Sequence, residues 1–239
     1  MRPHHGRRAA LLLLLCASLA APGPAVARAS RPLPASDEPA WPETMRVAAF
    51  TNISNVTLGR LDFLVWSNEA AAEGALLRTL LAEAGSTEVT VTPWRVTQGA
   101  LSGKKQGVER ELTFTAKVSA GMQSTARCHV VQHKHYYRRT VTVRSRQVML
   151  NIPFGKTFSV DMLWVMKSLG GRRVSVKVGV EVVFSSHTTF SGQIESVSHS
   201  ESAKMAGEWM GAIQRLVSGR PIVAHRPPAP PEMQLAAFG

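Results

Sequence analysis

Alternating apolar and polar residues predict a β-strand near residues 174–184. Apolar side chains stand at every second position, with mostly polar residues or glycine between them. Successive side chains of a strand point to opposite faces of a sheet, so this segment has one buried face and one solvent-facing face. The apolar positions are Val174, Val176, Val178, Val180, Val182 and Phe184. We therefore predict a half-buried antiparallel strand.

The same alternation recurs along residues 88–186 and predicts a meander of five or six strands. It is clear in residues 112–118 and 158–166, and weaker in residues 137–150. Residues that favour turns separate these runs. They are Gly103, Gly121, Pro153-Phe154-Gly155 and Gly170-Gly171. Consecutive strands joined by short turns pair in an antiparallel sheet.

Helical periodicity appears on both sides of this strand region. Before it, Ala and Leu recur at helical spacing in residues 69–84, and Gly85 supplies a stop. After Ser186, a broken apolar stripe predicts one helix of about 28 residues that ends near Gly219. The stripe consists of Phe190, Ile194, Val197, Met205, Trp209, Ile213 and Leu216. This order of elements predicts an α+β fold, in which a curved antiparallel sheet wraps around the long C-terminal helix and encloses a cavity.

The first 27 residues have the composition of a targeting leader. Arg2, Arg7 and Arg8 precede an apolar run of about 13 residues, and a small-residue cleavage site follows at residues 25–27. The run is shorter than the roughly 20 residues that a membrane-spanning helix needs. We therefore predict a signal peptide and a lumenal or secreted protein. An organelle-targeting leader or membrane association is the alternative, because the segment is rich in arginine and free of acids.

The chain after the leader divides into a linker, one domain and a tail. Residues 28–49 are rich in Pro, Ala and Ser, which predicts a flexible linker. Residues 219–239 are rich in Pro and predict a disordered tail. Residues 50–218 remain as a single domain, which is long enough to bury a sizeable core.

Two glycosylation sequons bear on the compartment of this domain, and its cysteines bear on what holds the fold together. Asn52 and Asn55 each begin a glycosylation sequon, which suits passage through a secretory compartment. Cys16 falls inside the leader, so Cys128 is left without a partner for an intramolecular disulfide. The fold must therefore be held by its apolar core.

Several short segments, in this order and at this spacing, resemble the VASt domain family. They are Val91-Thr92-Pro93-Trp94, Glu111-Leu112-Thr113-Phe114, Pro153-Phe154-Gly155-Lys156-Thr157-Phe158, Glu181-Val182-Val183-Phe184 and Ser191-Gly192-Gln193-Ile194-Glu195. The resemblance covers roughly residues 58–216. It implies a START-like helix-grip fold with an internal cavity that binds sterol, as in the membrane-contact-site sterol transporters of fungi and animals.

The resemblance also implies a non-enzymatic function: binding of a sterol or similar lipid and its transfer between membranes. Members of the family usually carry a GRAM domain upstream and a membrane-spanning helix downstream, and this chain has room for neither. We therefore expect an isolated lipid-binding module, with an unidentified partner as a possible source of membrane anchoring.

The wall of the expected cavity should come from the inward face of the sheet and from the C-terminal helix. An elongated apolar pocket favours a sterol because burial of apolar surface stabilises it by about 25 cal/mol per Å². The candidates are Phe114, Phe158, Val160, Met162, Trp164, Val178, Val180, Val182, Trp209 and Ile213. The alternative for each of them is a place in the ordinary core.

The formal net charge of +12 favours an anionic partner. Five basic residues are candidates for contact with an anionic membrane surface: Lys134, Arg138, Arg139, Arg172 and Arg173. Each basic residue near such a surface contributes about 1 kcal/mol. A solvated strand face is the alternative. Nucleic-acid binding, through arginines beside Tyr136 and Tyr137, is not expected behind a secretory leader.

Neither a metal site nor a cofactor is expected. Cys128, His129, His133 and His135 form the densest group of metal-binding residue types, but their spacing fits no standard zinc motif and nearby cations repel a metal.

No catalytic residues are predicted, because the sequence lacks a Gly-x-Ser-x-Gly elbow, a phosphate-binding glycine loop and a His-Glu-x-x-His helix. A small-molecule enzyme on a helix-grip fold is the alternative, and it would use Glu181, His187, Glu195 and His199. A cationic adaptor for membranes or nucleic acid is a further alternative.

Overall fold

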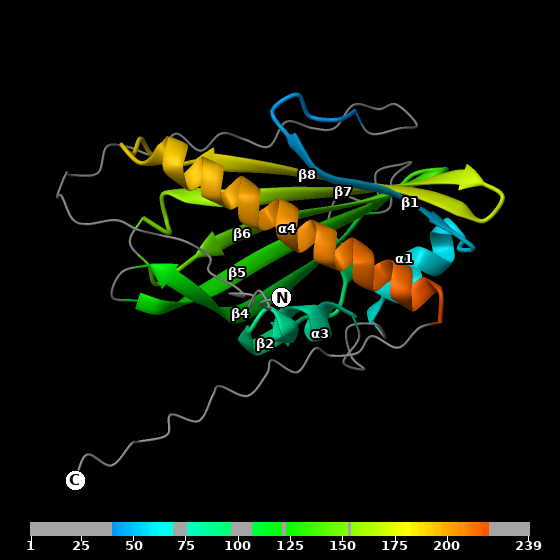
Figure 1. Cartoon of the computed structure of the whole chain (residues 1–239), viewed down its shortest axis with the longest axis horizontal. Helices are drawn as coiled ribbons and strands as arrows, with labels where there is room; N and C mark the ends of the chain where they lie inside the picture. The colour runs from blue at the N-terminus through cyan, green and yellow to red at the C-terminus, as the bar shows by residue number, and fades with distance from the viewer. Residues whose placement is uncertain (1–39, 69–75, 97–106, 121–122, 153, 220–239) are drawn as a thin grey trace, which may run out of the picture.

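The computed structural model describes residues 40–68, 76–96, 107–120, 123–152 and 154–219. They form one curved antiparallel sheet with a long helix laid across it (Figure 1). The predicted leader, most of the predicted linker and the proline-rich tail after Gly219 lie outside these residues. No helix in the described ranges combines the length and the apolar character that crossing a membrane requires.

The sheet of the described residues has eight strands. They are β1 (Arg46–Ser54), β2 (Thr87–Val91), β3 (Arg95–Val96), β4 (Gly107–Ala120), β5 (Gln123–Tyr136), β6 (Thr140–Met149), β7 (Phe158–Gly170) and β8 (Arg173–Phe184). The order across the sheet is β1-β8-β7-β6-β5-β4-β2, and β3 pairs with β4. The strands from β4 to β8 are a meander, as the alternating pattern predicts. The first strand in the chain pairs with the last one, so β1 lies beside β8.

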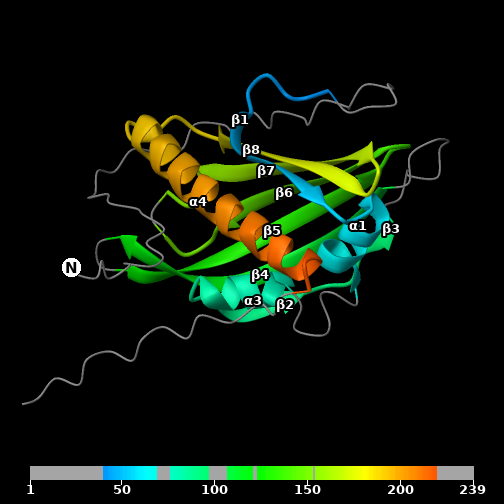
Figure 2. The ribbon, with the colours of Figure 1, turned by 45° about the vertical axis from the view of Figure 1, so that its right-hand side comes forward.

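The long helix α4 (Ser191–Val217) confirms the prediction of one terminal helix. It crosses the concave face of the sheet and packs closest to β1 and β8 (Figures 1 and 2). The residues buried on its sheet side include the small side chains of Ser198, Ser202 and Ala206, which follow one another at four-residue spacing. The α+β architecture with a sheet wrapped on a terminal helix is therefore confirmed.

The core lies between α4 and the concave face. Three tryptophans from different elements meet in it: Trp66, Trp164 and Trp209. Their ring centroids are 5.6–6.0 Å apart, in edge-on and tilted arrangements. Aromatic pairs in such geometry add about 0.5–1.5 kcal/mol beyond the burial of their area. This trio joins the sheet to the helices.

Two elements at the start of the domain differ from the sequence-based expectation. β1 begins at Arg46, inside the stretch predicted to be a flexible linker, so the ordered fold starts earlier than residue 50. Helix α1 (Leu58–Trp66) lies before the predicted first helix, and Thr57 caps it by accepting a hydrogen bond from the Arg60 backbone N–H.

The first predicted helix, over residues 69–84, corresponds in the described ranges to α3 (Leu76–Glu83). Residues 69–75 lie outside those ranges. Four leucines of α3 are buried: Leu76, Leu77, Leu80 and Leu81. Gly85 follows with a φ of +79°, the left-handed conformation that ends helices at glycine.

The segment before β1 packs against the outer, convex face of the sheet. A Cβ atom built on Gly179 would lie 2.5 Å from a ring carbon of Trp41, so the close approach of that indole requires glycine. The ammonium group of Lys177 lies 3.6 Å from the centroid of the same ring. Trp41 thus covers part of the outer face of β8.

Candidate functional site

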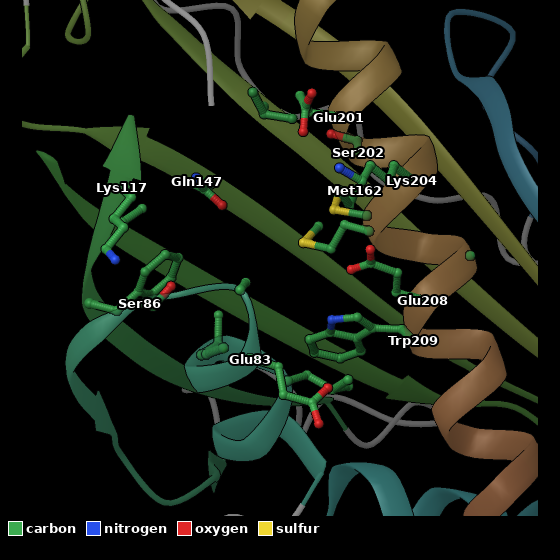
Figure 3. Close-up of a pocket in the computed structure, with 18 of the residues that line it drawn as sticks. Glu83, Ser86, Lys117, Gln147, Met162, Glu201, Ser202, Lys204, Glu208 and Trp209 are labelled. Carbon is green, nitrogen blue, oxygen red and sulfur yellow. The ribbon is translucent and has the colours of Figure 1, made fainter. Parts of the chain in front are cut away.

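An open pocket of about 670 Å³ lies between α4, α3 and the concave face of β4, β6 and β7. It exists because α4 packs closest to β1 and β8 and does not fill the space over β4, β6 and β7. Figure 3 shows Ser202, Glu208 and Trp209 of α4 on one side of this space, with Glu83, Ser86 and Lys117 on the opposite side. Its volume is in the range of about 300–1,000 Å³ that small-molecule sites occupy.

The floor of the pocket is apolar. Side chains from the sheet, α3 and α4 converge there: Leu80, Leu81, Phe114, Ala116, Met149, Val160, Met162 and Trp209. Most of these are buried side chains of the hydrophobic core, so the floor is a continuation of the core surface. The unbranched methionines adapt their shape to a ligand more readily than branched side chains do. The floor therefore suits a large apolar molecule.

Charged residues surround the opening of the pocket. Three of the lining residues are acidic and three are basic: Glu83, Glu201, Glu208, Lys117, Lys204 and Arg215. Two further polar side chains, Ser198 and Ser202, line the α4 wall between the charged rim and the apolar floor. The rim thus has no excess of either charge.

Gln147 is a polar side chain in the sheet wall of the pocket. Its Nε2 atom donates a weak hydrogen bond to the Cys128 Sγ atom over 3.5 Å. Cys128 is fully buried, and burial raises the pKa of its thiol from 9.0 to about 12 despite this hydrogen bond. The thiol is therefore protonated at neutral pH, and the Gln147 carbonyl oxygen remains a candidate for contact with a ligand.

The sequence matches the family described as VAD1 Analog of StAR-related lipid transfer domain, abbreviated VASt, over residues 50–201. The chain belongs to the VASt family. No curated protein gives a significant match. The predicted family is thus confirmed, and the protein contains a START-like lipid-binding domain.

The VASt domain brings four of the ten predicted wall residues to the pocket: Phe114, Val160, Met162 and Trp209. The other six lie outside its lining. Phe158 packs against Phe184, and Trp164 is enclosed in the tryptophan trio. Val178 and Val180 are buried because α4 covers β8 directly, and Ile213 is buried on α4 itself. Val182 is half-buried near the end of β8.

Other pocket residues were missed by sequence reasoning, notably Gln147, Ser198 and Ser202. The two serines stand four residues apart and Ala206 follows at the same interval, so a stripe of small residues on one helical face was the available signal. Gln147 faces inward among apolar neighbours in β6. One polar residue does not make a repeating pattern, so no signal in the sequence indicated its place in the pocket.

Lys134 does not lie at a surface, which corrects its assignment as a membrane-contact residue. Its side chain is 4% exposed and its Nζ atom lies 3.1 Å from an Asp62 carboxylate oxygen. Position 134 is on the inward-facing side of β5, because the side chains of a strand alternate and Cys128 and Val130 are also buried.

The other four basic candidates lie in two turns at one end of the sheet. Arg138 and Arg139 join β5 to β6, while Arg172 lies in the turn from β7 to β8 and Arg173 begins β8 directly after it. In an antiparallel meander these two turns fall at the same end. The pocket-lining residues of β4, β6 and β7 are nearer the opposite end of their strands, and none of these four arginines lines the pocket.

The four residues of the enzymatic alternative do not meet in the pocket. Glu195 pairs with Arg46 at 3.0 Å, His199 lies 3.8 Å from Glu195, and none of Glu181, His187, Glu195 and His199 lines the pocket. Burial lowers the pKa of His199, and the nearby Arg46 lowers it further.

The histidines near Cys128 pair with acids on the outer face of the sheet. His129 and His133 lie 3.1 Å from Glu111 and Glu109, respectively. Within the described ranges, no group of three or more His, Cys, Asp or Glu residues has an arrangement that holds a metal ion.

Proposed function

We propose that this protein holds a sterol or a similar lipid in the pocket between α4 and the sheet, and carries it between membranes without changing it chemically. The observation that carries the proposal is an open pocket of about 670 Å³ with an apolar floor, in a domain of a lipid-binding family. Removal of apolar lipid surface from water stabilises the complex by about 25 cal/mol per Å².

The two zones of the pocket suit the steps of such a cycle. The apolar floor replaces the hydrocarbon surroundings that the lipid leaves in a membrane. The charged rim, with exposed Lys117, Lys204 and Glu208, stays solvated while the pocket is away from a membrane. Lipid exchange then takes place through the gap between α3 and α4, with the rim against the head groups.

Membrane association is a second part of the proposal. The turn arginines Arg138, Arg139, Arg172 and Arg173 are all exposed and lie at one end of the sheet. Each contributes about 1 kcal/mol near an anionic surface, and the contribution falls with salt. Because none of these arginines lines the pocket, contact through these turns leaves the pocket free to face a second membrane.

Lipid binding is tested with the full chain and a fluorescent sterol competed by unlabelled cholesterol and ergosterol. The variant Ala84→Trp places an indole on the pocket lining, while Ala82→Trp adds the same group at an exposed α3 position outside that lining. We expect saturable binding, a loss of at least about tenfold in Ala84→Trp, which corresponds to about 1.4 kcal/mol, and little change in Ala82→Trp. No saturable lipid binding by the folded wild-type chain would sink the carrier function.

Transfer is tested by following a fluorescent sterol from donor to acceptor vesicles that contain phosphatidylserine. We expect Arg138→Glu combined with Arg173→Glu to slow transfer and weaken vesicle binding at low salt, with sterol affinity unchanged. Equal transfer by wild type and this variant would exclude the turns as the docking surface. The control is Arg127→Glu, since Arg127 is an exposed arginine of β5 away from both turns.

A further inference from the structure

A cluster of buried cationic side chains lies on the concave side of the sheet, next to α1. Arg110 of β4 is 2% exposed and Lys134 of β5 is 3% exposed. Asp62 of α1 is the acid beside them, at 3.1 Å from Lys134. Trp94 completes the cluster, with its ring centroid 4.3 Å from the Arg110 guanidinium carbon and 4.9 Å from the Lys134 Nζ atom. Figure 2 shows α1 beside β3 at this end of the sheet.

The charges within this cluster do not cancel. The Asp62 carboxylate accepts hydrogen bonds from Lys134 and from the Tyr136 hydroxyl, the latter over 3.1 Å. Arg110 instead donates through Nε to the Gln132 side-chain oxygen over 2.8 Å. Two buried cations thus share one carboxylate, and the guanidinium faces a neutral amide and two indole rings.

Two donors in the cluster have no acceptor among the described residues. The Arg110 Nη2 atom and the Trp66 Nε1 atom are both buried without a hydrogen-bond partner. The Arg110 guanidinium carbon lies 5.8 Å from the centroid of the Trp66 ring, so both donors belong to one neighbourhood. A buried donor without an acceptor is costly, and more so when it carries charge.

Arg110 keeps its charge despite this environment. Burial lowers the pKa of Arg110 from 12.5 to about 10, while nearby Asp62 raises it. At neutral pH the guanidinium is therefore protonated and lacks a full counter-charge. A negatively charged group with acceptor oxygens would balance the excess positive charge and would also accept hydrogen bonds from the two unpaired donors.

The cluster and the pocket share one row of inward-facing residues across the sheet. Arg110 is paired in register with Gln132, Gln132 with Ser145, and Ser145 with Met162, which lines the pocket. Directly opposed residues of neighbouring strands have Cβ atoms about 4.5–5.5 Å apart, so one row of side chains joins the cluster to Met162. Arg110, Gln132 and Ser145 lie beyond the pocket lining in this row. A second link is aromatic, since Trp66 packs against the pocket residue Trp209 with centroids 6.0 Å apart.

We propose that the cargo is an amphiphile with an anionic head group, whose oxygens accept hydrogen bonds from Arg110 Nη2 and Trp66 Nε1. The inference rests on the proposed carrier function, and it specifies the class of lipid: one that bears a carboxylate, sulfate or phosphate on an apolar skeleton. The skeleton fills the pocket, and the head group passes Trp209 and Ser145 to reach the cluster. A neutral hydroxyl supplies an acceptor but leaves the excess positive charge of the cluster in place.

The test compares the affinities of the full chain for cholesteryl sulfate and cholesterol by competition with one fluorescent sterol. Wild type should prefer the sulfate ester by about tenfold or more, because charge-assisted hydrogen bonds are roughly twice as strong as neutral ones. Arg110→Met retains an apolar side chain of similar length against Trp94 and removes the charge. It should bring the ratio close to one and leave cholesterol affinity within about threefold. Arg127→Met, which removes an exposed arginine of β5, should keep the wild-type preference.

The outcomes separate this inference from the function on which it rests. Equal affinities of wild type for the two sterols would overturn the anionic cargo while leaving sterol carriage intact. Equal loss of preference in Arg110→Met and Arg127→Met would assign the effect to net charge and overturn the site. Absence of binding to either sterol would overturn both proposals.

Two further measurements cover misfolding and free anions. The wild-type preference decides the question even if Arg110→Met does not fold, and Arg110→Lys should give an intermediate ratio because it keeps the charge and loses the planar fork. Inorganic sulfate should neither stabilise wild type against heat nor displace the sterol at millimolar concentration. Stabilisation by sulfate, without a preference for the sulfate ester, would identify a site for a free anion and overturn the lipid head group.

Discussion

Arg146 holds the buried carboxylate of Asp161 with both arms of its guanidinium. Its Nε and Nη2 atoms each donate to a different Asp161 oxygen over 2.9 Å, and Arg144 adds a third bond over 3.0 Å. The Asp161 side chain is fully buried, although both arginines are partly exposed. The hydrogen bonds that Arg146 donates to Asp161 raise the pKa of Arg146 above its ordinary value. Asp161 alternates with the pocket residues Val160 and Met162, so this ion cluster lies on the outer face of the sheet.

Asp161→Asn should therefore lower stability without changing the pocket. We expect a loss of about 2 kcal/mol in the free energy of unfolding, because charged hydrogen bonds contribute about 1.5–3 kcal/mol and the arginines retain access to water. Urea denaturation measures the loss, and sterol binding should be unchanged. Glu181→Gln, at the position paired with Asp161, is the control and should cost less than about 0.5 kcal/mol. A large loss of sterol affinity in folded Asp161→Asn would contradict the separation of the two faces.

Gly179→Val should destabilise the domain by displacing Trp41. A Cβ atom at position 179 would lie 2.5 Å from the indole, and overpacking of this kind costs about 1–3 kcal/mol. In a Trp41→Ala background the same substitution should cost less than about 0.5 kcal/mol, because the obstructing ring is gone and valine favours strands. A double-mutant cycle by urea denaturation measures the coupling. Equal costs in both backgrounds would show that Trp41 is not what the glycine accommodates.

Cys128 should reduce stability at alkaline pH. Its pKa is raised from 9.0 to about 12 in the folded domain, so between these values the thiol stays protonated when folded and loses its proton when unfolded. The contribution is neutral below about pH 9 and destabilises increasingly as the pH rises. At one pH unit above the unfolded pKa, it amounts to about 1.4 kcal/mol.

The measurement is the difference in unfolding free energy between wild type and Cys128→Ala at pH 8 and pH 10. The difference removes the parallel titration of Tyr136 and Tyr137, whose pKa values are also raised by burial. A difference that does not change with pH would show that the thiol is more hydrated than its burial indicates.

Asn52 and Asn55 should carry N-linked glycans if the leader directs the chain into the secretory pathway. Both side chains are exposed, in β1 and in the turn that follows it. Expression of the full chain in animal cells, followed by glycosidase treatment, should reveal a mass shift that Asn52→Gln and Asn55→Gln each reduce. A chain that reaches the secretory lumen without any glycan would contradict both sites, and a cytosolic chain would contradict the leader.

The sequence predicted the elements whose apolar positions recur regularly. β7, β8 and α4 follow periods of two and 3.6 closely, because one face of each packs on the core. The other face of β7 is buried too, but polar residues such as Ser159 and Asp161 keep the alternation visible. β1 escaped detection because it is an edge strand whose register shifts between Val47 and Ala49, and because Val47 and Phe50 are exposed. A shift of one residue in the pairing register moves the following side chains to the opposite face of the sheet, so the apolar residues no longer alternate with a period of two.

β5 was harder to recognise for a reason that bears on function. Its inward positions run from Ala126, Cys128 and Val130 to Gln132 and Lys134, so the buried face turns from apolar to polar along the strand. A pattern method reads the polar half as surface, which is why Lys134 was expected at a membrane. The same conflict between local pattern and burial marks the cluster that we assign to the head group of the cargo.

The pocket itself was predictable only in part. Inward-facing positions such as Phe114, Val160 and Met162 follow from the strand period, but the choice between core and pocket depends on where α4 lies over the sheet. That position is set by packing of small residues such as Ser202 and Ala206, which the sequence of α4 alone does not place against a particular strand.

The pairing of β1 with β8 also dictates an order of events during synthesis. Arg46 of β1 pairs with Val180 of β8, so β1 leaves the ribosome long before the strand with which it pairs. Until then Phe50 and the inward side of β1 have no sheet to join, and contacts between such distant segments close slowly. The meander from β4 to β8 can assemble from neighbours alone. The nascent chain therefore completes its sheet by pairing β1, the strand synthesised first, with β8, the strand synthesised last.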